Sequence, residues 1–75
     1  EDEVYHLVVH NDDVNTFDFV IMCLIDICEH TPEQAEQCTM LIHYKGKCTV
    51  KTGALEKLKP MHQALLDKGL SSEIV

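Results

Sequence analysis

The chain has 75 residues, which is enough for one domain with a modest hydrophobic core. Apolar residues make up 45% of it, a content typical of a globular protein, which excludes a disordered one. Thirteen acidic residues against six basic ones give a net charge of −7. This charge argues against nucleic-acid binding, because neutralising phosphates requires clustered Lys and Arg, and it favours cationic ligands or basic protein surfaces. With no run of about 18 apolar residues, the sequence predicts no membrane-spanning helix and no membrane partner.

The four cysteines are Cys23, Cys28, Cys38 and Cys48, and they form no CxxC pair. Their number is even, but their spacing matches no disulfide framework and the sequence shows no signal peptide. Three of them lie within apolar, helix-like segments, where cysteines are commonly buried. We therefore expect buried free thiols and a protein of the reducing cytoplasm.

The first third of the chain predicts a strand, a turn and a helix. Side chains alternate over Val4–His10 as in a β-strand, and Asn11-Asp12-Asp13 ends it because Asn and Asp favour turns. Thr16 is the expected N-cap of a helix over Phe17–Cys28. This helix is apolar on nearly every side, so it must be covered on more than one face or leave an apolar groove open.

The middle of the chain predicts a second helix and a second strand. Thr31-Pro32-Glu33-Gln34 places Thr at the N-cap, Pro at the first helical position and Gln where a capping box requires it. Gly46 is the expected end of this helix, and Lys47–Thr52 alternates as a strand. Apolar residues recur at helical spacing between these signals, at Ala35, Cys38, Leu41 and Ile42.

The last third predicts a helix over Ala54–Lys68, ended by Gly69, and a strand over Leu70–Val75. Pro60 fits this helix only within its first turn or two, or as a break before the main helix. The expected order is therefore β-α-α-β-α-β, in a single α+β domain over residues 1–75.

Two polar features could bind a ligand. Asn11-Asp12-Asp13 lies at the strand-to-helix junction, where such residues are most often turn formers and helix-dipole acids. Two carboxylates and an amide carbonyl in one place also suit an ammonium group, which has three donors. His43, late in the second helix, is either a core histidine or a hydrogen-bonding group that carries no permanent charge near pH 7.

Catalysis and metal binding find little support in the sequence. The histidines and cysteines lack metal-site spacing, and only His6 and His10 would share a strand face. No nucleophile elbow, phosphate-binding glycine loop or HExxH motif is present. We expect no enzyme activity, no metal and no cofactor, so the residues alone indicate an acidic α+β binding module.

Tyr5 to Asn15 reads YHLVVHNDDVN, Phe17 to Val20 reads FDFV, and Ile42 to Lys47 reads IHYKGK. Together these segments closely resemble the ClpS family, the adaptors of the bacterial N-end rule pathway. An NDD turn followed by an FV pair, with HYxGK after a helical hairpin, is a specific combination. It covers the first two thirds of the chain, and the last third matches loosely.

The resemblance implies a three-stranded antiparallel sheet packed on three helices. It also implies that the free α-amino group of a substrate protein binds at Asn11, Asp12 and His43, with Asp13 nearby. The first residue of that substrate, here called the N-degron residue, has a bulky hydrophobic side chain such as that of Leu, Phe, Tyr or Trp. The implied pocket for it consists of Asn15, Phe17, Val20, Thr39, Ile42 and Ile74.

At three pocket positions the chain departs from the residues that are common in the family. Phe17 and Thr39 stand where methionines are common, and Asn15 stands where threonine is common. Because Met adapts its shape more readily than Phe, these changes affect the pocket volume and the ranking of N-terminal residues.

The family further implies docking onto the N-terminal domain of a Clp-type AAA+ unfoldase, with Tyr44 and Lys59 near that contact. The implied function is an adaptor that binds such substrates and delivers them to the unfoldase and its protease. Family members use a flexible N-terminal extension for delivery, which is absent from the 75 residues, and a chain without it could bind substrates and fail to hand them over. Three alternatives stay open: a ClpS-like regulator of the unfoldase without N-degron binding, an interaction module similar to the C-terminal domain of the ribosomal stalk protein, and a metal-binding domain. The joint presence of Asn11, Asp12 and His43 argues against the stalk-like module.

Overall fold

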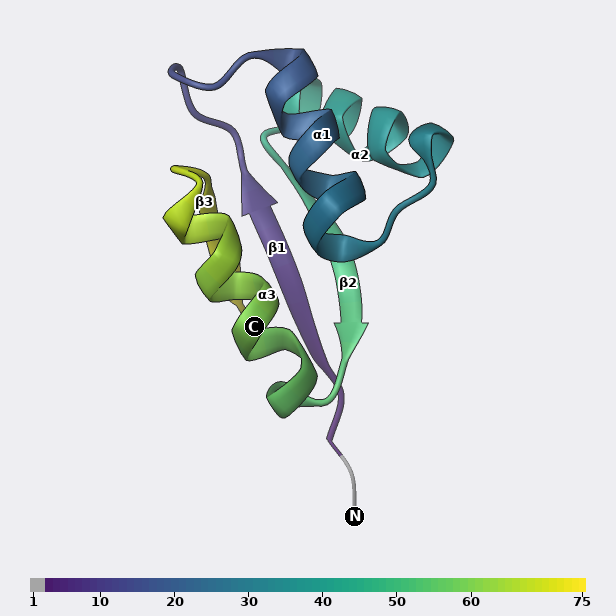
Figure 1. Ribbon diagram of the computed structural model, residues 1–75, viewed down its shortest axis with the longest axis vertical. Coiled ribbons are helices and arrows are strands. Elements are labelled where there is room, and N and C mark those ends of the chain that lie inside the picture. The colour runs from purple at the N-terminus through teal and green to yellow at the C-terminus, as the bar shows by residue number, and fades with distance from the viewer. Residues whose placement is uncertain (1–2) are drawn as a thin grey trace.

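The computed structural model in Figure 1 describes residues 3–75. Its elements are β1 (Tyr5–His10), α1 (Phe17–Cys28), α2 (Pro32–Lys45), β2 (Lys47–Gly53), α3 (Leu55–Asp67) and β3 (Ser71–Ile74). The β-α-α-β-α-β order expected from the sequence is confirmed. The observed bounds differ from the expected ones by about one residue at some ends, as is usual where a terminal hydrogen bond decides the assignment.

β1 is the central strand of an antiparallel sheet whose strand order is β2-β1-β3. His10, the last residue of β1, pairs with Lys47 at the start of β2 and with Ser71 at the start of β3. The end of β1, the start of β2 and the start of β3 therefore lie at the same end of the sheet. The chain enters β2 from α2 and β3 from α3 there. The topology brings the turn after β1 beside the C-terminal ends of these two helices (Figure 1).

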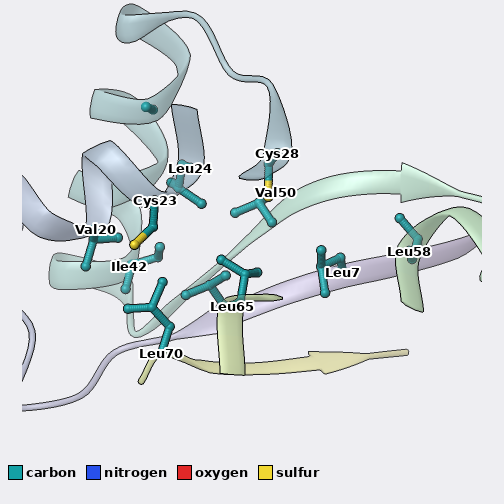
Figure 2. Packing of buried hydrophobic residues seen from close by; sticks show 12 residues of the cluster. Leu7, Val20, Cys23, Leu24, Cys28, Ile42, Val50, Leu58, Leu65 and Leu70 are labelled. Carbon is teal, nitrogen blue, oxygen red and sulfur yellow. The ribbon is translucent and has the colours of Figure 1, made fainter. Parts of the chain in front are cut away.

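All three helices pack on one face of the sheet. Leu7 and Val9 of β1 and Val50 of β2 belong to the same buried cluster as residues of every helix. Figure 2 shows Leu7 and Val50 among the side chains that meet between the helices and the strands. The largest fully buried side chains are Leu7, Leu24, Leu58, Leu65, Val9 and Cys28. Burial of this apolar surface is the main favourable term in folding.

Short-range signals in the sequence set both ends of α2. The side chain of Thr31 accepts from the backbone of Gln34 at 3.1 Å, and the side chain of Gln34 accepts from the backbone of Thr31 at 3.0 Å. The expected capping box is thus present. Gly46 ends the helix at φ 97, a conformation that glycine adopts without strain. In α3, Pro60 lies in the second turn of a continuous helix, the first of its two expected placements.

Leu41 differs from the expectation. Helical spacing assigns it to the core, but its side chain is 45% exposed. The buried residues of α2 are Ala35, Thr39 and Ile42, and Leu41 is rotated by about 100° from Ile42 around the helix axis. The buried face of α2 is therefore narrower than the set of apolar residues at helical spacing.

The four cysteines are free thiols, with Cys23 and Cys28 buried and Cys38 and Cys48 half-buried. Burial raises the pKa of the Cys28 thiol to about 11. Burial, together with the neighbouring Cys38 thiol, raises the pKa of Cys48 to about 12. Because the thiolate is the reactive form, Cys28 and Cys48 are poor nucleophiles at neutral pH.

In the part of the chain from residue 3 to residue 75, no helix has the length and apolar character needed to cross a membrane. The same residues contain no group of three side chains placed to ligate a metal ion. His6 and His10 point to one side of β1, but each has its own partner. The His6 ring contacts the Thr52 hydroxyl at 3.0 Å, and the His10 ring pairs with Glu73 at 2.5 Å.

Candidate functional site

The turn after β1 is organised around the carboxylate of Asp12. Its Oδ1 accepts the backbone N–H of Val14 at 2.9 Å and that of Asn15 at 2.8 Å. Its Oδ2 accepts from the side-chain amide of Asn15 at 2.9 Å. These bonds form an Asx-type turn, the local structure that Asp favours because its short side chain reaches its own backbone. The carboxylate is therefore held in one orientation.

Two further contacts attach this turn to the rest of the fold. The backbone N–H of Asn11 donates to the carbonyl of Gly46 at 2.9 Å, next to the end of α2. The side-chain amide of Asn15 donates to the carbonyl of Gly69 at 2.9 Å, in the connection between α3 and β3. Thr16 then caps α1 by accepting the backbone N–H of Phe19 at 3.1 Å. The turn is thus connected to the ends of three helices.

The environment of Asp12 stabilises its ionised form. Burial by itself raises the pKa of the Asp12 carboxyl, but the hydrogen bonds from Asn15 and Val14 favour the carboxylate and lower the pKa below its usual value. Asp12 is therefore negatively charged at neutral pH and at moderately acidic pH. A fixed negative charge at this point attracts a cation.

His43 lies in the last turn of α2 and faces the start of α1. The centre of its ring is 6.3 Å from that of Phe17, in an edge-to-face arrangement, and 5.0 Å from that of Tyr44. These edge-to-face contacts restrict the orientation of the His43 ring. Among the hydrogen bonds formed by the described residues, none uses a His43 ring nitrogen, so both nitrogens can serve a ligand.

These side chains surround a pocket of about 350 Å³ between the turn, α1 and α2. Its floor is apolar and almost fully buried, with Val20 exposed by 8%, Thr39 by 2% and Ile42 by 4%. The Thr39 hydroxyl donates to the carbonyl of Ala35 at 2.7 Å, so its polar atom is satisfied within α2. The complete lining is Asn11, Asp12, Asp13, Asn15, Thr16, Phe17, Val20, Thr39, Ile42 and His43. Polar acceptors at one end and an apolar floor at the other suit a ligand with a cationic head and a hydrophobic body.

The family model described as "ATP-dependent Clp protease adaptor protein ClpS" matches residues 1–73 of this chain. The chain belongs to the ClpS family. It is 38% identical over 68 residues to the ATP-dependent Clp protease adapter protein ClpS of Thermosynechococcus vestitus, an alignment that covers 89% of this chain and 72% of the relative. It is 33% identical over 61 residues to the ClpS protein of Nitratidesulfovibrio vulgaris, covering 79% of this chain and 61% of that one.

The fold has a solved counterpart. The structure of Agrobacterium tumefaciens ClpS2 bound to L-phenylalaninamide superposes with a TM-score of 0.90 and covers 100% of this chain and 98% of that one, at 18% identity. The three-stranded antiparallel sheet with three helices is therefore the ClpS fold, and the expected fold class and family are confirmed.

Nine of the ten residues that the ClpS resemblance assigned to amine binding and the pocket line the single cavity described above. Ile74 does not. Since β3 runs antiparallel to β1, its first residue, Ser71, lies beside His10, whereas Ile74 pairs with Leu7 near the other end of the strand. There it packs against the hydrophobic core. The structure therefore does not bring Ile74 together with the other nine residues.

The two residues expected at the unfoldase contact lie on different helices. Tyr44, 73% exposed, follows His43 at the end of α2. Lys59 is exposed in the first half of α3, the helix that follows the C-terminal end of β2. The fold does not join them into one small site.

Sequence reasoning missed Thr16 and Gly69. Thr16 both caps α1 and lines the pocket, and its position between Asn15 and Phe17 is the sequence signal for the second role. Gly69 contributes through its backbone carbonyl, which accepts from Asn15. A backbone contact between residues so distant in the chain leaves no signal in one sequence.

Proposed function

We propose that this chain is an N-degron adaptor. It binds proteins by a free N-terminal α-amine together with a bulky hydrophobic first side chain (Leu, Phe, Tyr or Trp), and it delivers them to a Clp-type AAA+ unfoldase and its protease. One observation carries the proposal: the acceptors of Asn11, Asp12 and His43 line the same pocket as the apolar floor. An N-terminal residue presents an ammonium group and a side chain on one carbon atom, so it can use both parts at once.

The polar end of the pocket fits an ammonium group in number and in charge. An ammonium group has three N–H donors, and the Asn11 side-chain carbonyl, the Asp12 carboxylate and a neutral His43 ring nitrogen are acceptors. The ionised Asp12 supplies the charge complement. An acetylated N-terminus has neither the charge nor the three donors, so the site discriminates against it.

The apolar end selects the side chain. Burying a Leu or Phe side chain contributes roughly 1.5–3 kcal/mol, and each hydrogen bond to a charged amine adds about 1.5–3 kcal/mol where water is excluded. Micromolar binding requires about 8 kcal/mol, so neither part suffices alone. The site should therefore demand a free amine and a bulky hydrophobic side chain together.

Membership of the ClpS family supports this proposal, and so does the solved relative of the same fold, whose bound L-phenylalaninamide carries a free α-amine and a benzyl side chain. The chain spans 72% and 61% of the two curated relatives described above. Delivery to the protease, which involves the whole protein, is part of the proposal.

Fluorescence anisotropy with labelled peptides tests substrate recognition. The series begins with Leu, Phe, Ile and acetyl-Leu and is otherwise identical. We expect binding of the Leu and Phe peptides and loss of binding on acetylation. Equal binding of the acetylated peptide would refute the amine-based mechanism and favour a regulator that does not bind N-degrons.

We propose that Tyr44 and Lys59 contact the unfoldase. The exposed phenol ring of Tyr44 offers a large aromatic surface of the kind that dominates protein interfaces, and Lys59 offers a positive charge on an acidic protein. Binding of the isolated N-terminal domain of a Clp unfoldase to Tyr44→Ala and Lys59→Ala variants tests this. We expect weaker domain binding with unchanged affinity for the Leu peptide; unchanged domain binding in both variants refutes the assignment.

A further inference from the structure

Asn15 connects the turn after β1, at Asp12, with the α3–β3 connection, at Gly69. Its side-chain nitrogen donates one hydrogen bond to Asp12 Oδ2 and one to the carbonyl of Gly69, both at 2.9 Å. An amide NH₂ group has two donors, so both are used. Both partners are acceptors, which requires that the nitrogen and not the oxygen faces them. Both N–H donors of the side chain are therefore committed to the protein.

The carboxylate of Asp12 offers about four acceptor positions, two on each oxygen. The backbone N–H groups of Val14 and Asn15 occupy both positions of Oδ1, and the Asn15 side chain occupies one of Oδ2. The acceptor position left for a ligand is on Oδ2, the oxygen that the Asn15 side chain holds. The direction of that position depends on Asn15.

We infer that Asn15 is a positioning residue for recognition of the N-terminal amine: it aims the free acceptor of Asp12 and couples the amine-binding turn to the α3–β3 connection at Gly69. This inference rests on the proposed function and changes the role expected for Asn15, which the sequence placed among the residues around the substrate side chain. A residue that acts through Asp12 affects every free-amine peptide alike, whatever its first side chain.

The Gly69 end of this link is anchored in the core. Gly69 adopts φ 87 after α3, and its neighbour Leu70 is 4% exposed in the same buried cluster as Val20 and Ile42 of the pocket floor. The position of the Gly69 carbonyl is thus set by the packing that also builds the floor. Serine, whose hydroxyl donates a single hydrogen bond, could satisfy Asp12 or Gly69 but not both.

The first test compares peptide affinities of Asn15→Ala, Asn15→Ser and the unmodified chain. We expect Asn15→Ala to weaken the Leu and Phe peptides about 10-fold each, with a smaller loss for Asn15→Ser. Gln63→Ala is a matched control, because Gln63 also donates a side-chain amide hydrogen bond to a carboxylate, Asp67 at 3.0 Å, on the exposed face of α3. We expect it to bind both peptides unchanged.

The second test separates positioning from general destabilisation. The titration of the Asp12 carboxyl is followed through its own ¹³C resonance, so that Asp13 and His43, which also line the pocket, and Lys68, which precedes Gly69, do not contribute to the signal. Loss of the Asn15 side chain removes one stabilising hydrogen bond from the carboxylate, so its titration midpoint should move to higher pH in Asn15→Ala and Asn15→Ser. A variant that is only less stable keeps the midpoint while it remains folded, and thermal unfolding identifies the temperature range where it does.

The third test uses the background variant Asp12→Asn. Since Asn15 acts through the Asp12 carboxylate, adding Asn15→Ala to it should change the affinity by less than about twofold. If the unmodified chain binds the acetylated peptide as tightly as the free-amine peptide, the proposed function fails. If it reads the free amine but Asn15→Ala leaves the affinity and the Asp12 titration unchanged, or acts additively with Asp12→Asn, the proposed function stands and this inference is wrong.

Discussion

The backbone N–H of Asn11 donates to the carbonyl of Gly46 across 2.9 Å. Gly46 ends α2, and its own N–H donates to the carbonyl of Ile42 on the pocket floor. This pair of bonds joins the end of β1 to the end of α2. It is the reason that a turn near the start of the chain and a histidine on the second helix line the same pocket.

The positive φ of Gly46 makes this junction sensitive to substitution. Gly46→Ala places a side chain at φ 97, which costs about 1–2 kcal/mol although the space around it is open. We expect urea denaturation to show that loss, together with weaker binding of the Leu peptide. Gly53→Ala is the control, because Gly53 has no positive φ and its added Cβ makes an ordinary contact. Equal losses in the two variants would refute the role of the Gly46 conformation.

In the proposed function, the Asp12 carboxylate supplies the negative charge that attracts the substrate amine. Asp12→Asn should weaken all free-amine peptides by about 1.5–3 kcal/mol, because a charged donor loses its charged partner. Anisotropy measures the loss, and Asp18→Asn, an exposed acid in the first turn of α1, serves as the control. Loss confined to one class of side chain would mean that Asp12 contacts the side chain of the ligand and not its amine.

The lowered pKa of Asp12 also predicts how stability depends on pH. A carboxyl whose folded pKa lies below its unfolded value stabilises the protein above the unfolded pKa, and this contribution disappears as the pH falls through the folded pKa. The difference in unfolding free energy between the unmodified chain and Asp12→Asn should therefore shrink between about pH 5 and pH 2. A difference that stays constant over this range contradicts the assignment.

Thr39 lies on the floor of the pocket. Thr39→Met adds volume at a residue that is 2% exposed, so we expect it to weaken Phe and Trp peptides more than Leu peptides, by about 1–2 kcal/mol. Thr39→Val is the matched control: it keeps the size and loses only the hydroxyl bond to Ala35, so the ranking of the peptides should persist. An unchanged ranking in Thr39→Met would show that position 39 does not meet the ligand.

Thiol labelling tests the packing around α1 and β2. Because burial raises the pKa values of Cys28 and Cys48 to about 11 and about 12, their thiolates are scarce at pH 7 and increase as the pH rises toward those values. We expect a disulfide reagent to modify both cysteines much more slowly in the native protein than in the chain unfolded in guanidinium, with mass spectrometry locating the label. Rapid native labelling of Cys28 would contradict its burial.

The Thr31 capping box, the Gly46 helix end and the alternating strands could be predicted from the sequence, because each depends on interactions between residues a few positions apart. The same local patterns, with the ClpS resemblance, indicated nine of the ten candidate site residues that line the pocket. Ile74 lies outside that lining, beside Leu7, since strand register depends on pairing with β1 rather than on local pattern. The core stripe of α2 was also too wide at Leu41, because packing partners decide which side of a helix is covered.

By itself, then, the sequence of this protein determined its elements, their order and the family, since local hydrogen bonding and side-chain periodicity act over short separations. Only the tertiary structure decided how the Asn11-Asp12-Asp13 turn is oriented. It did so through two backbone carbonyls, those of Gly46 and Gly69, which accept from Asn11 and Asn15. Every residue has a backbone carbonyl, so residue types do not reveal which carbonyl accepts a distant donor; the packing of three helices on one sheet selects it.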